Sequence, residues 1–357
     1  MIRYSDNQLK PEIIRMWKAV FNDSDEFINL YFRSKYKDEN TLVKVNEGQV
    51  ASSLQMLPYT LTFCDSELPV AYISGASTFP EERKKGYMEE LLVASFSEMK
   101  KKNVPITILI PQENWLFGFY EKYGYAPVFE HGEESVEFQC IRVPVSDFVR
   151  EVMPENLSRI ADYCRHVSVK QPLTVQKTHS DWLTVFEDHY LANGKIFYVE
   201  ENQEIKGVAF VLKNEENEVL VKELLTDDEV IRNQLLNQIA QVYGGCKLLV
   251  ITSLSGIRAK AFGMARIIDA QKILTIYAQK YPRLNFSIHI VDNQCDWNTT
   301  FFRVNAGQCV ETESQSVDFD VTINLFTQLM FGYRISSLPE KYHLFPEVVP
   351  KMSLMLE

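Results

Sequence analysis

Hydrophobic residues recur along this chain with two different periods, and the change of period separates helices from strands. Between residues 8 and 36, spacings of three and four predict two helices, around Ile13–Val20 and Phe27–Phe32, with Asp23 or Ser24 as the N-cap of the second. From Thr41 onward, β-branched and aromatic runs separated by turn signals predict antiparallel strands at 41–46, 50–57, 59–64 and 70–79.

The next elements follow an order that recurs later in the chain. After a basic turn we expect a helix from Met88 to Met99, a strand at 106–110 and a helix from Asn114 to about Tyr123. Residues 196–252 repeat this order loosely, with strands at 196–201, 205–212 and 218–225, a helix at 230–242 and a closing strand at 247–252. The repetition indicates an internal duplication.

The last hundred residues follow a different order. Asp269 is placed to cap a helix, strands are expected at 286–291, 300–305 and 317–322, and Thr322 opens a helix that runs to Gly332. Mixed helices and strands throughout predict an α/β (α+β) chain. Its 357 residues exceed one ordinary core, so we expect two or three domains.

Charge and cysteine usage narrow the choice of partners and compartment. The chain has 37 Lys and Arg against 48 Asp and Glu, a net charge of −11, which favours a cationic substrate and disfavours nucleic acid. Its six cysteines form no Cys-x-x-Cys pair, and its six scattered histidines do not suggest a metal site. No signal peptide or membrane-length apolar run is visible, so we expect a cytoplasmic protein that needs neither a membrane nor a metal.

The turn Arg83-Lys84-Lys85-Gly86-Tyr87 is the strongest local signal for chemistry. A helix N-terminus offers unpaired backbone N–H groups, a preceding glycine lets an anion approach, and basic side chains add charge. Together these features suit a pyrophosphate, although such a turn can also be only a solvated helix start. The P-loop, dinucleotide, HExxH and GxSxG motifs are all absent.

Two runs of residues resemble a known family. Ser74–Pro80 followed by Glu82–Met88 and Leu91-Leu92 resembles the acetyl-coenzyme-A motif of GNAT-type N-acetyltransferases, and Asn114–Tyr125 resembles the second motif of that family. Met88 stands where Gly or Ala is usual, as in the enhanced-intracellular-survival type. That subfamily has two GNAT-like mixed-sheet domains followed by a sterol-carrier-like α+β domain. The resemblance implies a catalytic domain at 1–140, a degenerate GNAT-like domain at 141–254 and a carrier-like domain at 255–357.

The resemblance also implies roles for individual residues. Backbone groups of Thr78 and Phe79 would pair with the pantetheine arm of acetyl-coenzyme A. Tyr120 would be the general acid for the departing thiolate, and Asn114 would help orient the coenzyme or a water. The pyrophosphate would be held by the backbone N–H groups of Arg83, Lys84, Lys85, Gly86, Tyr87 and Met88.

Two of these roles have plainer alternatives. Tyr120 falls on the inward face of its helix with Leu116, Phe119 and Tyr123, so it could simply be a core residue. In the subfamily the terminal carboxylate is thought to be the general base, which here would be Glu357. The segment 352–357 could equally be an edge strand or a frayed end.

The second copy of the strand–turn–helix pattern carries acidic residues, Asp227-Asp228-Glu229, where the first carries basic ones. These carboxylates would satisfy the helix N-terminus and repel a pyrophosphate, so we expect one coenzyme site per chain.

We therefore expect an acetyl-coenzyme-A-dependent N-acetyltransferase that acts on a primary amine of a cationic small molecule or of a lysine. The resemblance also implies a homo-oligomer. One alternative is an acyl- or lipid-binding carrier without transferase activity, although Phe286, Ile288, Ile290, Phe301 and Phe302 could fill a closed core. A third class, aminoacyl transfer from tRNA, is disfavoured by the acidic charge.

Overall fold

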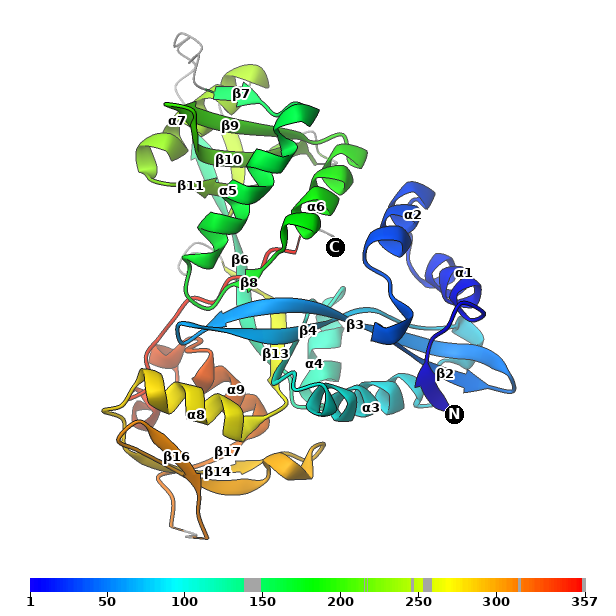
Figure 1. Cartoon of the computed structure of the whole chain (residues 1–357), viewed down its shortest axis with the longest axis vertical. Helices are drawn as coiled ribbons and strands as arrows, with labels where there is room; N and C mark the ends of the chain where they lie inside the picture. Colours follow the sequence, from blue (N-terminus) through cyan, green and yellow to red (C-terminus); the bar gives the residue numbers. More distant parts are fainter. Residues whose placement is uncertain are drawn as a thin grey trace. The chain divides into compact units, whose positions relative to one another are not determined.

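The computed structural model describes residues 1–137, 149–214, 216, 218–244, 247–252, 259–313 and 316–354. The chain divides into two compact units (Figure 1). Unit 1 comprises Met1–Phe129 with Phe262–Pro350, and unit 2 comprises Glu130–Ala261 with Lys351–Glu357. No helix in the described ranges is long and apolar enough to cross a membrane.

The main sheet of unit 1 has the strand order β1-β2-β3-β4-β5-β13. Its strands are β1 (Ile2–Tyr4), β2 (Thr41–Asn46), β3 (Gln49–Phe63), β4 (Ser66–Thr78), β5 (Ile106–Leu109) and β13 (Lys260–Ile267). Neighbours are antiparallel except β4 and β5, which run parallel. The separate strands expected at 50–57 and 59–64 are the single strand β3. Pro58, which has no N–H to donate, is tolerated because the β2 ladder ends at Gln55.

Helices cover both faces of this sheet: α1 (Lys10–Val20), α2 (Asp25–Ser34), α3 (Tyr87–Lys101) and α4 (Asn114–Glu121). Leu92 and Phe96 of α3 pack in one buried cluster with Ile73 of β4. On the other face, the Tyr31 hydroxyl of α2 lies 3.0 Å from Gln55 Oε1 and 2.7 Å from Ser74 Oγ. Because neighbouring strand residues point to opposite faces, α2 and α3 sandwich the sheet.

The C-terminal part of unit 1 forms a second sheet, in the order β16-β15-β14-β17. The predicted caps are present: Asp269 accepts from the N–H of Lys272, and Thr322 accepts from that of Leu325. Phe286, Ile288, Ile290 and Phe302 are at most 1% exposed, so these side chains fill a packed core. The elements are α8 (Ala270–Lys280), β14 (Phe286–Val291), β15 (Thr300–Asn305), β16 (Gln308–Glu311), β17 (Phe319–Thr322) and α9 (Ile323–Met330).

A buried arginine ties the two sheets of unit 1 together. Arg266 of β13 donates from Nη2 to both carboxylate oxygens of Asp292, at 2.8 and 2.9 Å, and neither side chain is exposed. Its Nε donates to the carbonyl oxygen of Tyr123 at 2.7 Å, just after α4. Its guanidinium also lies 4.1 Å from the centre of the Phe96 ring. The arginine thus bonds to the chain segment that follows α4.

Unit 2 has its own sheet, in the order β6-β12-β11-β10-β9-β7. Helix α7 packs on the face that carries Ala209, whereas Trp182 of α6 contacts Phe210 on the other face. The elements are β6 (Ala126–Glu137), β7 (Val149–Glu151), α5 (Leu157–Val169), β8 (Val175–Gln176), α6 (His179–Leu191), β9 (Lys195–Glu201), β10 (Glu204–Lys213), β11 (Val219–Thr226), α7 (Glu229–Val242) and β12 (Lys247–Thr252). Short 3₁₀ turns lie at Asp38–Asn40, Pro80–Glu82, Pro154–Asn156, Asp296–Asn298, Ile335–Ser337 and Glu340–Tyr342.

Both units contain a strand, a helix and a second strand parallel to the first: β4–α3–β5 and β11–α7–β12. In each case the parallel pairing stops early, at Tyr72 in β4 and at Val221 in β11, although the first strand continues. The register of each first strand also shifts just beyond that point, which marks a β-bulge. Each parallel pair therefore opens toward the start of its helix.

Candidate active site

The end of β4 borders the opening in unit 1. Pairing with β5 ends at Tyr72, so no described strand of this unit covers that edge of β4 from residue 73 to 78. Thr78, the last residue of β4, shares a 2.8 Å hydrogen bond with the Ser52 hydroxyl. The N–H of Phe79 already donates to the Ala51 carbonyl at 3.1 Å. The Phe79 carbonyl in turn accepts from the N–H of Glu82 at 2.9 Å, so both backbone groups of this residue, one of the two expected at the pantetheine arm, are already bonded.

The basic turn leads directly into α3. Lys84 and Gly86 both have positive φ, 64° and 79°, a conformation that costs a residue with a side chain more than it costs glycine. Gly86 is the N-cap residue of α3, and no side chain caps that end. A Cβ built on Gly86 would meet only Glu89 Oε2, at 3.8 Å. The first N–H groups of α3 therefore border open space.

The basic side chains of this turn differ in how far they are neutralised. Lys85 Nζ pairs with Glu82 at 2.9 Å, and this hydrogen bond raises the pKa of Lys85. Arg83 Nε donates to the Thr78 carbonyl at 3.4 Å, which keeps its charge available. Lys84 forms no ion pair with a described residue. The turn keeps a net positive charge beside the uncapped helix end.

The corresponding helix of unit 2 begins differently. Asp228 is the N-cap of α7, and its side chain accepts from the N–H groups of Val230 and Ile231 at 2.8 and 2.9 Å. These are the donors that an anion would need. The carboxylate of the acidic turn thus satisfies the N–H groups at the start of its own helix, as the sequence predicts.

Tyr120 is the one buried residue of α4, at 7% exposure. It belongs to the cluster formed by Ile73 of β4 and Leu91 of α3, against which Met88 also packs. Its hydroxyl forms no hydrogen bond with a described residue, and burial raises its pKa to about 12. Tyr120 is therefore a core residue by position, as the plainer alternative holds, yet its hydroxyl is left without a partner.

The neighbouring tyrosines differ from Tyr120 in their contacts. Tyr125 is fully buried, and its hydroxyl lies 3.2 Å from Thr107 Oγ1, which itself donates to the Ala71 carbonyl at 2.9 Å. Tyr123 packs on the edge of the same cluster and on the ring of Phe119. These contacts give Tyr125 and Tyr123 packing roles.

Asn114 and Glu357 are also predicted for the site. Asn114 is the first residue of α4, at the opposite end from Tyr120, and it is exposed. Glu357 lies outside the described residues.

A polar cluster beside the β4 bulge was not anticipated from the sequence. Gln55 Nε2 and Ser53 Oγ are buried without a hydrogen-bond partner among the described residues. Gly75 at the bulge has φ +56°, and a Cβ there would lie 2.5 Å from the Trp17 ring and 2.9 Å from Gln55 Nε2. The available signal was the polar run Ser52-Ser53 and Gln55 within residues 50–57, which are otherwise apolar.

The N-terminal and C-terminal parts of the chain each match a known protein family. Residues 1–128 match the family described as acetyltransferase (GNAT) domain, and residues 273–339 match the family described as sterol carrier protein domain. No curated protein matches the chain. Among the described residues, no group of three or more His, Cys, Asp and Glu side chains is placed to hold a metal ion.

Solved structures share the fold over nearly the whole chain. A GCN5-related N-acetyltransferase from Anabaena variabilis is 15% identical, with 98% of each chain covered and a TM-score of 0.77. Eis1 from Mycobacterium abscessus is 12% identical, with 99% of each chain covered and a TM-score of 0.75. A GCN5-related N-acetyltransferase from Kribbella flavida is 15% identical, covers 98% of this chain and 96% of its own, and has a TM-score of 0.73.

These matches define a class of protein: the chain carries a GNAT acetyltransferase domain and is an acyltransferase enzyme, of the class that uses acyl-coenzyme A. The resemblance to the enhanced-intracellular-survival type is also confirmed. The chain joins its GNAT domain to a sterol carrier protein domain, and it shares its mixed α/β fold with Eis1.

Proposed function

We propose that this enzyme transfers the acetyl group of acetyl-coenzyme A to a primary amine of a cationic small molecule or of a lysine side chain. The observation that carries the proposal is the uncapped N-terminus of α3, which follows Gly86 and a basic turn. Met88 in the first turn of this helix packs against the cluster that holds Tyr120.

The residues of the turn fit a pyrophosphate. The backbone N–H groups from Lys84 to Met88 and the charge of Arg83 and Lys84 would hold it. The N–H of Arg83, also expected there, already donates to the Pro80 carbonyl at 3.4 Å. The open edge of β4 after Tyr72 offers backbone groups for the pantetheine arm. Asp228 already fills the matching position in unit 2, so we propose one coenzyme site per chain.

The proposed reaction is a direct transfer. The amine nitrogen forms a bond to the thioester carbonyl carbon, the C–S bond breaks, and the thiolate takes a proton from the Tyr120 hydroxyl. The raised pKa keeps Tyr120 protonated at neutral pH, as a proton donor must be. The proton lost by the amine goes to a base, for which we propose the carboxylate of Glu357.

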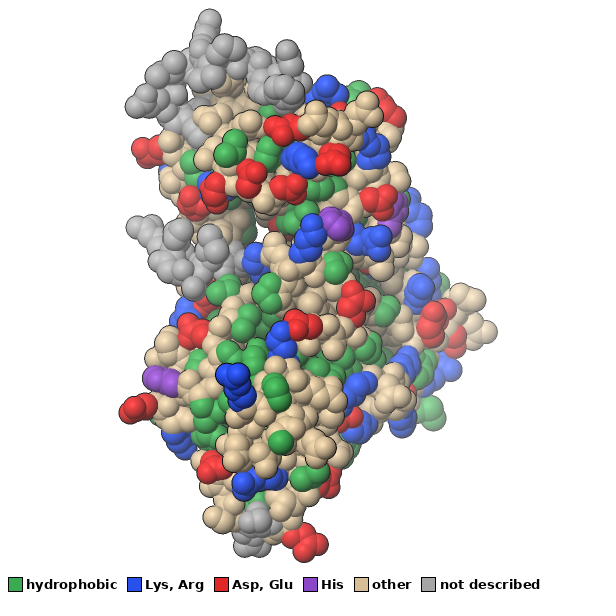
Figure 2. Space-filling model, turned by 60° about the vertical axis from the view of Figure 1, so that its left-hand side comes forward, with side chains coloured by type: hydrophobic (Ala, Val, Ile, Leu, Met, Phe, Trp, Pro, Cys, Tyr) green, Lys and Arg blue, Asp and Glu red, His purple; other side chains and the backbone are tan. Residues whose placement is uncertain are grey.

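The charge of the chain supports a cationic acceptor without locating its pocket. The net charge is −11, and acidic and basic side chains are interspersed on the face shown in Figure 2. An acidic protein attracts a polyamine over a distance of roughly 10 Å at ordinary ionic strength.

We retain the domain boundaries at 1–140, 141–254 and 255–357, the cytoplasmic location and the homo-oligomeric state as predictions.

The test is a panel of amines incubated with acetyl-coenzyme A, with free thiol release as the readout. We expect turnover with at least one polycationic amine or lysine peptide. Gly86→Glu places a carboxylate where the pyrophosphate would bind and should abolish turnover, whereas Gly86→Ala is the matched control. It carries the same positive-φ strain, about 1 kcal/mol, without the charge. Equal turnover by the two variants would show that the coenzyme does not bind at this turn.

A further inference from the structure

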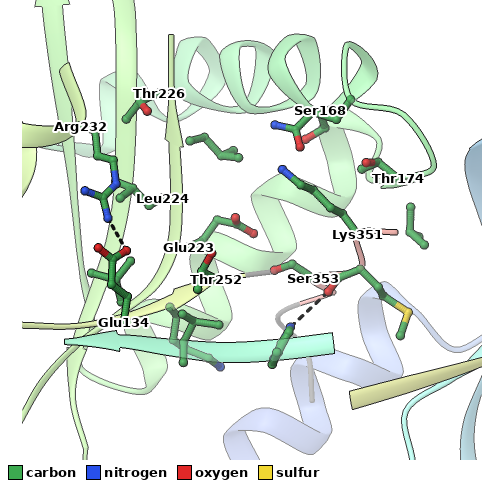
Figure 3. A pocket seen from close by; sticks show the side chains of 18 of the residues that line it. Glu134, Ser168, Thr174, Glu223, Leu224, Thr226, Arg232, Thr252, Lys351 and Ser353 are labelled. Atoms are coloured by element: carbon green, nitrogen blue, oxygen red, sulfur yellow. Dashed lines mark hydrogen bonds and ion pairs between the residues drawn. The ribbon is translucent and has the colours of Figure 1, made fainter. Parts of the chain in front are cut away.

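Unit 2 contains a cavity of about 290 Å³ at the place where β11 and β12 stop pairing (Figure 3). The two strands pair only at Leu220 with Leu249 and Val221 with Val250, and the bulge of β11 falls at Lys222. The walls come from the end of β11, the end of β12, the first turns of α7, part of β6, the segment 168–177 and the segment 351–353. The cavity therefore occupies, within unit 2, the position that the opening between β4 and β5 occupies within unit 1.

Several charged groups in the cavity wall are already bonded to the protein. Arg232 Nη2 pairs with Glu134 Oε2 at 2.6 Å, and both side chains are partly exposed. Lys177 Nζ donates to the Ser353 carbonyl and lies 4.1 Å from the centre of the Trp182 ring. These charges are compensated and line the cavity as part of its structure.

Lys351 and Glu223 are different, because neither forms an ion pair or hydrogen bond through its side chain with a described residue. Figure 3 shows the two side chains pointing toward one another across the cavity. Burial lowers the pKa of Lys351, and the negative charge of Glu223 opposes that shift. The ammonium therefore lies in a partly desolvated position, within the field of one carboxylate but not in contact with it.

The position of Lys351 is fixed by its backbone. Its N–H donates to the Leu173 carbonyl at 3.0 Å, and its carbonyl accepts from the N–H of Val175 at 3.0 Å. Glu223 is fixed in turn by the ladder, since it pairs with Phe210 just after the bulge. The opposed charges are thus held on two rigid segments, which is how a protein prepares a site for a ligand of matching charge.

The same cavity is unsuited to a coenzyme. Asp228 uses the N–H groups at the start of α7, and its negative charge would repel a phosphate. A volume of about 290 Å³ also lies at the lower limit of ligand pockets, roughly 300–1,000 Å³. Both facts exclude a coenzyme, and the opposed charges of Lys351 and Glu223 favour a small ligand that carries one positive and one negative group.

We propose that this cavity binds a free α-amino acid, with the carboxylate of the ligand on the Lys351 ammonium and the ammonium of the ligand on the Glu223 carboxylate. Each group would gain a charge-assisted hydrogen bond that the protein leaves unmade. The walls of this cavity belong entirely to unit 2, whereas the turn proposed to bind the coenzyme belongs to unit 1.

The experiment is titration calorimetry of the full chain with each of the common L-amino acids at millimolar concentration. We expect at least one to bind, and its decarboxylated amine and deaminated acid to bind at least tenfold more weakly. Lys351→Met and Glu223→Gln should each weaken binding tenfold or more. Lys213→Met, which changes an exposed lysine outside the cavity, should leave it unchanged.

Three outcomes would overturn the proposal: no amino acid binds, the amine or the acid alone binds as well as the amino acid, or Lys213→Met weakens binding as much as Lys351→Met. Thermal unfolding of the same variants checks that each is folded. We expect no loss of stability in Lys351→Met, because the substitution removes an unpaired, half-buried charge. Gly86→Glu should retain amino-acid binding, so failure of the transferase proposal and failure of this one are distinguishable.

Discussion

Replacing Tyr120 with phenylalanine removes the proposed general acid and preserves the ring. The hydroxyl has no hydrogen-bond partner among the described residues, so its removal costs the fold no bond. We expect the free energy of unfolding to stay within about 0.5 kcal/mol of that of the parent protein. General acid catalysis contributes roughly 10²–10⁴-fold, so kcat should fall by at least about 100-fold.

Tyr125→Phe is the matched control. Tyr125 lies in the same buried cluster, but its hydroxyl contacts Thr107 at 3.2 Å. Loss of that hydrogen bond should cost about 0.5–1.5 kcal/mol of stability. A domain of this size loses about 2–4 °C in Tm for each kcal/mol. Turnover by this variant should remain close to that of the parent protein.

Thiol release at saturating amine, together with thermal unfolding, separates the two variants. The reasoning requires Tyr120→Phe to lose turnover but not stability, and Tyr125→Phe to lose stability but not turnover. It would be refuted by full turnover in Tyr120→Phe, which would leave Tyr120 as a packing residue. Because the pKa of Tyr120 is raised to about 12, its ionisation should also produce no fall in kcat as the pH rises to about 10.

Three other changes test the structural roles of buried groups. Asp228→Ala removes a helix cap and should cost about 0.5–2 kcal/mol of stability in chemical denaturation, without adding a second coenzyme site in calorimetry. Arg266→Met leaves Asp292 buried and unpaired, and should cost about 3–5 kcal/mol. Burial lowers the pKa of His189 in the native state. Below about pH 6.5 the unfolded state therefore binds a proton at this residue that the native state does not bind. The free energy of unfolding should therefore decrease as the pH is lowered below that value. The decrease should be less steep in His189→Gln.

Local signals in the sequence predicted much of the fold. Ser24, Asp269 and Thr322 each cap a helix, because capping depends on one side chain and the next three backbone groups. Asp228 was correctly expected to satisfy its own helix for the same reason. The inward position of Tyr120 followed from helical spacing alone.

Features that depend on distant partners could not be read in the same way. Strand β13 contains Gly263 and the charged Arg266, so its sequence gives no apolar alternation, and the arginine is buried only because Asp292 receives it. Helices α5 and α6 were not assigned, although the capping box of Thr178 and Asp181 was available as a signal. Lys351 and Glu223 are far apart in the sequence and face one another only in the folded protein, which no local pattern records.

The path of the chain through its two units has a consequence for synthesis. Unit 1 is built from two segments, and Leu109 of β5 pairs with Met264 of β13, which follows the body of unit 2. A ribosome adds about 5–20 residues per second. Strand β5 therefore remains unpaired on its β13 side for on the order of ten seconds, until β13 has been synthesised. During that interval the nascent N-terminal segment exposes an unpaired strand. A fragment that ends at residue 129 would keep it exposed permanently, and should aggregate rather than yield an isolated catalytic domain.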